Sequence, residues 1–167
     1  MSANQIRKPD FVAVKRLAWQ VLEENFVTKP PVIAARLVRA YELEAFEAEF
    51  KPEYDHIAGF IDFDNKKILV NAGDSTARKN FTAAHELGHY LLKHNVENGY
   101  TVLLRDMGAM IKTPVEQEAN CFAANVLVPE QFLREYLDNY SHITERQLAS
   151  IFGVSEDVIR YRKLYLQ

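Results

Sequence analysis

One segment of this chain is Ala84-His85-Glu86-Leu87-Gly88-His89, in which two histidines lie four residues apart and a glutamate directly follows the first. On an α-helix, side chains four positions apart share a face with their Cβ atoms roughly 5–6 Å apart, so both imidazoles can bind one metal ion. Glu86 lies about 100° around the helix from His85, where its carboxylate can reach a water molecule held by that metal. The pattern predicts a metal-dependent hydrolase in which Glu86 is the general base.

The surrounding residues 74–92 are predicted to form one helix, with Asp74 or Ser75 as its N-cap. Its apolar side chains recur at helical spacing, at Phe81, Ala84, Leu87, Gly88, Leu91 and Leu92. Both histidines lie beside this stripe, so we expect them to be at least partly buried. A buried neutral imidazole needs a partner for each ring nitrogen, which a metal and a hydrogen-bond acceptor provide. The alternative is an amphipathic helix that carries two surface histidines.

A third ligand is expected on a second helix, which runs from Glu116 to Val128 and is stopped by Pro129. Glu118 borders the apolar face of this helix, whereas Glu116 falls about 200° away and should be solvated. A carboxylate against a core needs a cation or hydrogen bonds. We therefore predict that Glu118 completes a two-histidine, one-glutamate site for Zn²⁺, with Mn²⁺ or another divalent metal as alternatives. The opposing interpretation is that Glu118 is an ordinary exposed glutamate.

The remaining periodicities predict an α+β fold, in which a small three-stranded antiparallel sheet packs against helices. Helices are expected at residues 10–26 and 31–41, and strands at 43–50, 57–63 and 67–71. Asp64-Asn65-Lys66 separates the last two strands and is typical of a hairpin turn. Residues 100–105 could add a further strand.

Several segments together resemble the ImmA/IrrE-type metallopeptidases: Gly59-Phe60-Ile61-Asp62, Ile68-Leu69-Val70-Asn71, the run from Arg78 to Leu92, and the run from Glu116 to Pro129. The resemblance implies a zincin-like core in which His85, His89 and Glu118 bind the metal and Glu86 is the catalytic base. It also implies a substrate: a helix-turn-helix repressor or antitoxin, whose cleavage switches on mobile-element or stress genes. One position departs from the family. Where its members often carry another histidine, this chain has Lys93, with His94 next to it.

The C-terminal residues 141–167 resemble a helix-turn-helix and are predicted to form an extension packed on a peptidase domain at residues 1–140. The resemblance leaves two alternatives open: a DNA-binding regulator, or a metal-binding protein that sequesters a repressor without cutting it. Glu156 and Asp157 lie at the start of the second helix, where phosphates would repel them. Charge therefore argues against direct nucleic-acid binding, and favours packing on the core or docking of the repressor.

The composition is that of an ordinary globular protein, with 48% hydrophobic residues and a net charge of −3 over 167 residues. The single cysteine excludes an intramolecular disulfide. No apolar run suits a membrane span and the first residues contain no apolar signal core, so we expect a cytoplasmic protein. The group that stabilises the oxyanion is left open among Tyr90, His94, Tyr100 and Arg105.

Overall fold

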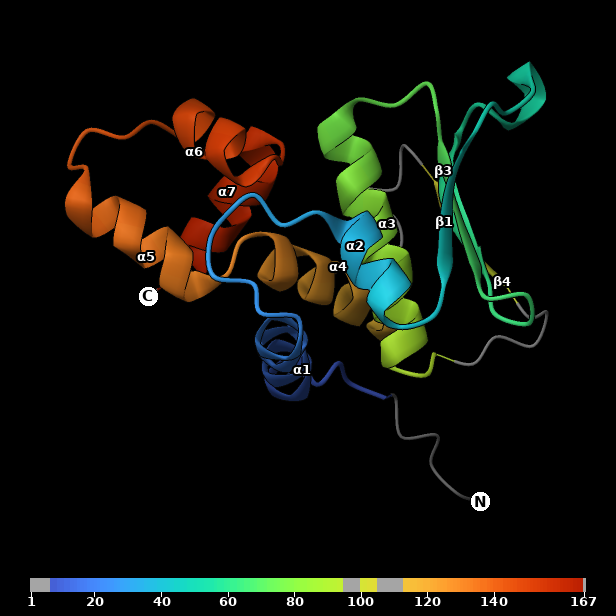
Figure 1. Cartoon of the computed structure of the whole chain (residues 1–167), viewed down its shortest axis with the longest axis horizontal. Helices are drawn as coiled ribbons and strands as arrows, with labels where there is room; N and C mark the ends of the chain where they lie inside the picture. Colours follow the sequence, from blue (N-terminus) through green and yellow to red (C-terminus); the bar gives the residue numbers. More distant parts are fainter. Residues whose placement is uncertain (1–6, 95–99, 105–112, 167) are drawn as a thin grey trace.

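The computed structural model describes residues 7–94, 100–104 and 113–166 (Figure 1). Three helices and three strands precede the histidine-bearing helix: α1 (Phe11–Glu24), α2 (Ala34–Ala40), β1 (Glu44–Ala48), the 3-10 helix η1 (Pro52–Tyr54), β2 (Ile57–Asp62) and β3 (Lys67–Asn71). The histidine-bearing helix and the later elements are α3 (Thr76–Leu91), β4 (Tyr100–Leu104), α4 (Pro114–Leu127), α5 (Glu130–Asn139), α6 (Glu145–Phe152) and α7 (Glu156–Leu164). The α+β class is therefore confirmed. No helix in these described ranges is long and apolar enough to cross a bilayer.

The four strands form one mixed sheet in the order β1-β3-β2-β4, and the α-helices lie on one side of it (Figure 1). β2 and β3 form the predicted antiparallel hairpin, whose turn is closed by the Asn65 amide donating to Asp62 Oδ1 at 2.9 Å. β4 pairs antiparallel with β2 on the other side. β1 pairs with β3, and the two strands run parallel, with Phe46 opposite Leu69.

The prediction of three antiparallel strands was therefore wrong in number and in direction. Alternation of apolar residues tells which side chains share a face of a strand, but not which strand lies next to which. Here the connection at residues 49–56, which contains η1, lets the chain cross from β1 to β2 while β3 takes the place between them.

Helix α3 lies between the sheet and α4, which explains the burial of residues 82–89. Its N-terminus is capped by Ser75, whose hydroxyl accepts from the Arg78 amide at 3.2 Å. From Thr82 to His89 every residue is buried. One side packs on β2 and β3, and another packs on α4. Gly88 permits this close approach, because a Cβ at that position would lie 2.9 Å from Cδ1 of Phe122 on α4.

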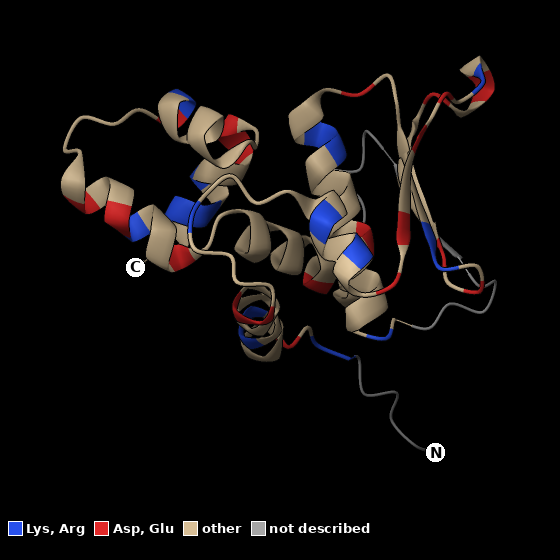
Figure 2. Cartoon of the chain, in the orientation of Figure 1, with Lys and Arg blue, Asp and Glu red and all other residues tan. Residues whose placement is uncertain are grey.

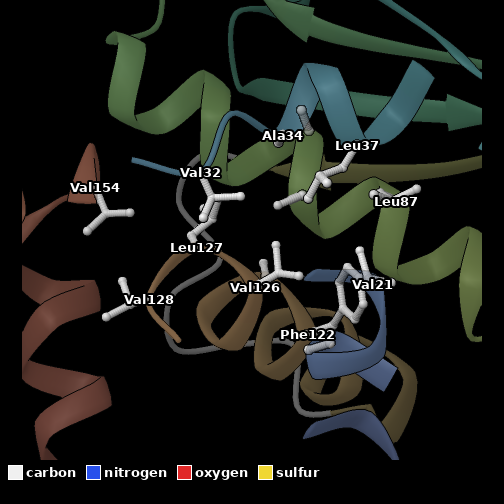
Figure 3. Close-up of a cluster of buried hydrophobic side chains, with 14 of the residues drawn as sticks. Val21, Val32, Ala34, Leu37, Leu87, Phe122, Val126, Leu127, Val128 and Val154 are labelled. Atoms are coloured by element: carbon white, nitrogen blue, oxygen red, sulfur yellow. The ribbon is translucent and has the colours of Figure 1, made fainter. Parts of the chain in front are cut away.

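Helix α4 is covered on more than one side, since α1 packs against it as well as α3 (Figure 1). Thr113 caps its start and Pro114 occupies the first turn, a position that tolerates proline. It ends before Pro129, as predicted. Its apolar residues, including Phe122 and Val126, join α1, α2 and α3 in one core (Figure 3).

The C-terminal helices α6 and α7 are joined through Gly153, where the sequence predicted a tight turn between two helices. This pair shares the main hydrophobic core through Phe152 and Ile159, both fully buried. The buried Arg162 donates from Nε to the carbonyl oxygen of Val128 at 2.8 Å. That bond fixes α7 to the C-terminal end of α4.

Gly153→Ala is expected to lower the free energy of unfolding by about 1 kcal/mol, because an L side chain is disfavoured in the left-handed region. Gly153 has a φ of +67° and is the C-cap of α6. Urea denaturation followed by circular dichroism measures the change. Ser150→Ala, on the exposed face of the same helix, is the control and should leave stability nearly unchanged.

Candidate metal centre

His85 and His89 lie one turn apart on α3 and present the same ring nitrogen to one point. Their Nε2 atoms are 3.0 Å apart, and each residue is only 1% exposed. The rings meet edge to face, with their centroids 4.7 Å apart. The predicted convergence and burial of the two imidazoles are confirmed.

The carboxylate that meets these imidazoles belongs to Glu116, in the first turn of α4. Its Oε2 lies 3.2 Å from Nε2 of His85, and its Oε1 lies 3.2 Å from Nε2 of His89. The side chain keeps 18% of its surface exposed, so solvent can reach this side of the cluster. Among the residues that the structure describes, His85, His89 and Glu116 form the group that could hold a metal ion.

Glu118 was predicted in this place and Glu116 in solvent, and the structure places both differently. Glu118 is buried, at 2% exposure, as predicted, but its carboxylate bonds to His94, Arg7 and the amide of Asp10. The two glutamates were assigned from the apolar stripe of α4, on the assumption that only this stripe is covered. Because α1 and α3 cover different sides of α4, a residue outside the stripe also faces a neighbouring helix.

The ring of His85 is oriented by a hydrogen bond on its other nitrogen. Its Nδ1 lies 3.0 Å from Oδ1 of Asn120, one turn after Glu116 on α4. An amide oxygen can only accept, so Nδ1 of His85 carries the proton. Nε2 of His85 is then left with a lone pair that points toward Glu116.

The ring of His89 is held through a second histidine. Nδ1 of His89 lies 3.0 Å from Nδ1 of His94, and Nε2 of His94 lies 2.9 Å from Oε2 of Glu118. Burial lowers the pKa of His94, which favours the neutral ring, although the hydrogen bond to Glu118 acts in the other direction. A neutral His94 that donates from Nε2 to a carboxylate must accept at Nδ1. His89 therefore donates from Nδ1 and keeps a lone pair on Nε2.

This donor set fits a divalent cation. Two imidazole lone pairs and a carboxylate converge, and such a cluster is unfavourable unless a positive charge lies between its members. Tetrahedral bonds to Zn²⁺ of about 2.0–2.2 Å separate two ligand atoms by roughly 3.3–3.6 Å. The separations here, 3.0 and 3.2 Å, approach that range.

The electrostatics of Glu116 agree with a site for positive charge. Burial acts to raise the pKa of its carboxyl, but His85 and His89, when their rings are protonated and donate to it, outweigh that effect and hold the pKa below its ordinary range. Positive charge next to Glu116 thus keeps its side chain an ionised carboxylate, the form that a metal ligand must have.

Glu86, the predicted base, follows His85 on α3 and is fully buried. Among the oxyanion candidates, His94 is engaged with His89 and Glu118, and the ring of Tyr90 stacks on Phe63 with centroids 6.4 Å apart. Tyr100 belongs to β4, and its side chain is outside the described part. Arg105 also lies outside the described residues.

Three contributors were missed: Glu116 was placed in solvent, and Arg7 and Asn120 were given no role. A signal for two of them is present in the sequence. Glu116 and Asn120 are four residues apart, so they share a face of α4, as His85 and His89 share a face of α3. Arg7 approaches from a distant segment, and nothing in its local sequence indicates that contact.

Comparison with known proteins places this site in a family of peptidases. The family model described as IrrE N-terminal-like domain matches residues 39–163, which include α3, α4 and the C-terminal helices. Metallopeptidase ImmA of Bacillus subtilis (strain 168) is 29% identical over 96 residues, covering 58% of this chain and 55% of that protein. The radiation response metalloprotease IrrE of Deinococcus radiodurans is 29% identical over 150 residues, covering 75% of this chain and 44% of that protein.

Two further similarities complete the comparison. Uncharacterized immunity region protein 2 of Bacillus phage phi105 is 29% identical over 113 residues, covering 66% of this chain and 68% of that protein. A solved Mycobacterium tuberculosis transcriptional regulator superposes with a TM-score of 0.68 at 18% identity, covering 93% of this chain and 56% of that one, and shows the fold alone. The chain spans about half the length of the two metallopeptidases it matches.

Proposed function

This chain belongs to the family of IrrE N-terminal-like domains, and from that premise we propose that it is a metal-dependent endopeptidase. The observation that carries the proposal is the convergence of His85, His89 and Glu116 from two helices. Two nitrogens and one carboxylate are the protein ligands of catalytic zinc sites, which keep a further position open for water or substrate. We therefore propose Zn²⁺ as the metal, held by these three residues rather than by a set containing Glu118.

We propose the following roles for the side chains. When bound, a divalent metal polarises the scissile carbonyl and lowers the pKa of a water molecule. Glu86 takes a proton from the attacking water and returns it to the leaving amine nitrogen. Asn120 keeps the ring of His85 in the tautomer that leaves Nε2 free.

The proposed substrate is a helix-turn-helix repressor or antitoxin. The proposal rests on the resemblance to the ImmA/IrrE-type peptidases, and the similarity to a phage immunity region protein supports a link to mobile elements. The alternative of direct DNA binding receives no support from charge. Arg160, on α7, is bound to Glu145, Asp157 and Glu156, and both basic and acidic residues lie on α6 and α7 (Figure 2).

Incubation with the helix-turn-helix protein encoded beside this gene tests the proposal directly. We expect the partner to be cut into two discrete fragments, with cleavage abolished by a chelator and restored by added Zn²⁺. Binding of the partner without fragments, in the presence of the metal, would indicate sequestration and contradict the peptidase. Retention of the chain on random-sequence DNA at low salt would favour the DNA-binding alternative.

Glu116→Ala is expected to remove most of the bound metal, because it deletes one of three protein ligands and leaves two neutral imidazoles. Elemental analysis after dialysis should show about one Zn²⁺ per chain in the parent and a small fraction of that in the variant. Glu135→Ala, which removes an exposed carboxylate on α5, is the matched control and should keep the parent's content. A parent-like metal content in Glu116→Ala would reject Glu116 as a ligand.

A further inference from the structure

Beyond the three proposed ligands, a buried chain of hydrogen bonds runs from His89 through His94 to Glu118. His94 and Glu118 are 5% and 2% exposed, and neither belongs to the group that could hold the metal. We propose that His94 and Glu118 are positioning residues, which fix the tautomer and the ring orientation of His89 for metal binding. The inference rests on the metal site proposed above.

The backbone at the end of α3 places His94 for this role. Lys93 adopts a left-handed conformation, with a φ of +55°, and turns the chain back over the end of the helix. The amide of His94 then donates to the carbonyl oxygen of His89 at 3.0 Å, so the two residues are joined by backbone as well as by side chain. This left-handed conformation is disfavoured for a residue other than glycine. That conformation is what brings the two imidazoles into contact.

Glu118 determines which atoms donate and which accept along the hydrogen bonds from His89 through His94. The carboxylate of Glu118 accepts from Nη2 of Arg7 at 2.6 Å and from the amide of Asp10 at 2.8 Å. It therefore also accepts from Nε2 of His94, at 2.9 Å. A neutral His94 with its proton on Nε2 can only accept at Nδ1. His89 must therefore donate to it from its own Nδ1. The tautomer of His89 is thus determined two side chains away.

Glu118 connects the metal centre to the start of α1 through its hydrogen bonds to Arg7 and Asp10. Asp10 is the N-cap of α1, where its side chain accepts from the Ala13 amide at 2.9 Å. The backbone amide of Asp10 donates to the carboxylate of Glu118. Three segments distant in sequence therefore meet at one carboxylate. At the other histidine, Nδ1 of His85 is oriented by one hydrogen bond to Asn120, which is an exposed residue.

Two substitutions of His94 separate hydrogen-bond direction from packing. His94→Leu fills the space but leaves the Nδ1 proton of His89 without an acceptor. His94→Gln restores the same polarity, because its amide oxygen accepts from His89 and its amide nitrogen donates to Glu118. The same pair of substitutions at His142, which is exposed before α6, is the matched control.

The first readout is the Zn²⁺ dissociation constant, measured by competition with a chromogenic chelator. His94→Leu is expected to weaken binding by roughly 10–100-fold, the usual effect of losing a partner of a metal-bound histidine. His94→Gln should stay within roughly 3-fold of the parent, since it keeps the donor and the acceptor. Parent-like binding by His94→Leu would overturn the proposal. So would equal weakening in both variants, since it would mean that only the shape of the imidazole matters.

The second readout is the tautomer of His89 in the metal-free protein, from the ¹⁵N shifts of the imidazole. We expect the proton on Nδ1 in the parent and in His94→Gln, and a population with the proton on Nε2 in His94→Leu. A parent with the proton of His89 on Nε2 would overturn the proposal even if no variant folds. Should the parent bind no Zn²⁺, the proposed function fails, while this second readout still decides the positioning role.

Discussion

Glu86→Gln is expected to lose cleavage by on the order of 10²–10⁴-fold while keeping the fold and the bound metal. Glutamine has nearly the shape of glutamate, so the packing of α3 should survive. An amide has no basic oxygen at neutral pH, however, and cannot take a proton from the attacking water. The residue is fully buried beside His85, so bulk water does not readily replace it as the base. The turnover number with a confirmed substrate is the measurement.

The controls for this variant separate chemistry from binding. Zn²⁺ content by elemental analysis should equal that of the parent, because Glu86 is not one of the proposed ligands. Glu135→Gln, on the exposed side of α5, should cleave at the parent's rate. Parent-like turnover in Glu86→Gln would mean that another group accepts the proton.

Phe122→Ala is expected to lower the free energy of unfolding by about 3–5 kcal/mol, the usual range for loss of a buried phenylalanine. Phe122 is fully buried on α4, among side chains from α1 and α3 (Figure 3). Its ring packs directly on Gly88, which lies between the two histidine ligands proposed for the metal. The backbone hydrogen bonds of α3 and α4 keep these helices rigid, so they do not move together enough to fill the space left by the ring.

Urea denaturation in the presence of a chelator measures this loss without a contribution from metal binding, which stabilises only the folded state. Phe26→Ala is the matched control. Phe26 follows α1 and is 88% exposed, so its truncation should change stability by less than about 0.5 kcal/mol. A loss of similar size in both variants would contradict the central place of Phe122 in the core.

Much of the local structure could be predicted from the sequence, because its causes are local. The apolar spacing around His85 and the cap at Ser75 led to a helix at 74–92, and the structure has α3 at Thr76–Leu91. The hairpin turn and the stop at Pro129 were placed correctly for the same reason. The convergence of His85 and His89 also followed, since positions four apart on a helix must share a face.

The third carboxylate could not be chosen in the same way. A helical periodicity gives the angle between Glu116 and Glu118, but not which neighbouring helix each one meets. That depends on α1 and α3 covering different sides of α4. The sheet order was missed for a related reason, since β1 lies beside β3 through pairing that no local pattern encodes.

By itself, then, the sequence determined the α-helices other than α5, the strands β1 to β3 and the pair of imidazoles, because hydrogen bonds and side-chain spacing within a few residues fix them. Tertiary packing alone decided that Glu116 meets the histidines and that Glu118 instead holds His94, Arg7 and the start of α1. Those contacts join residues up to 111 positions apart. Their partners are selected by the burial of whole helices, a quantity that depends on every element of the core at once.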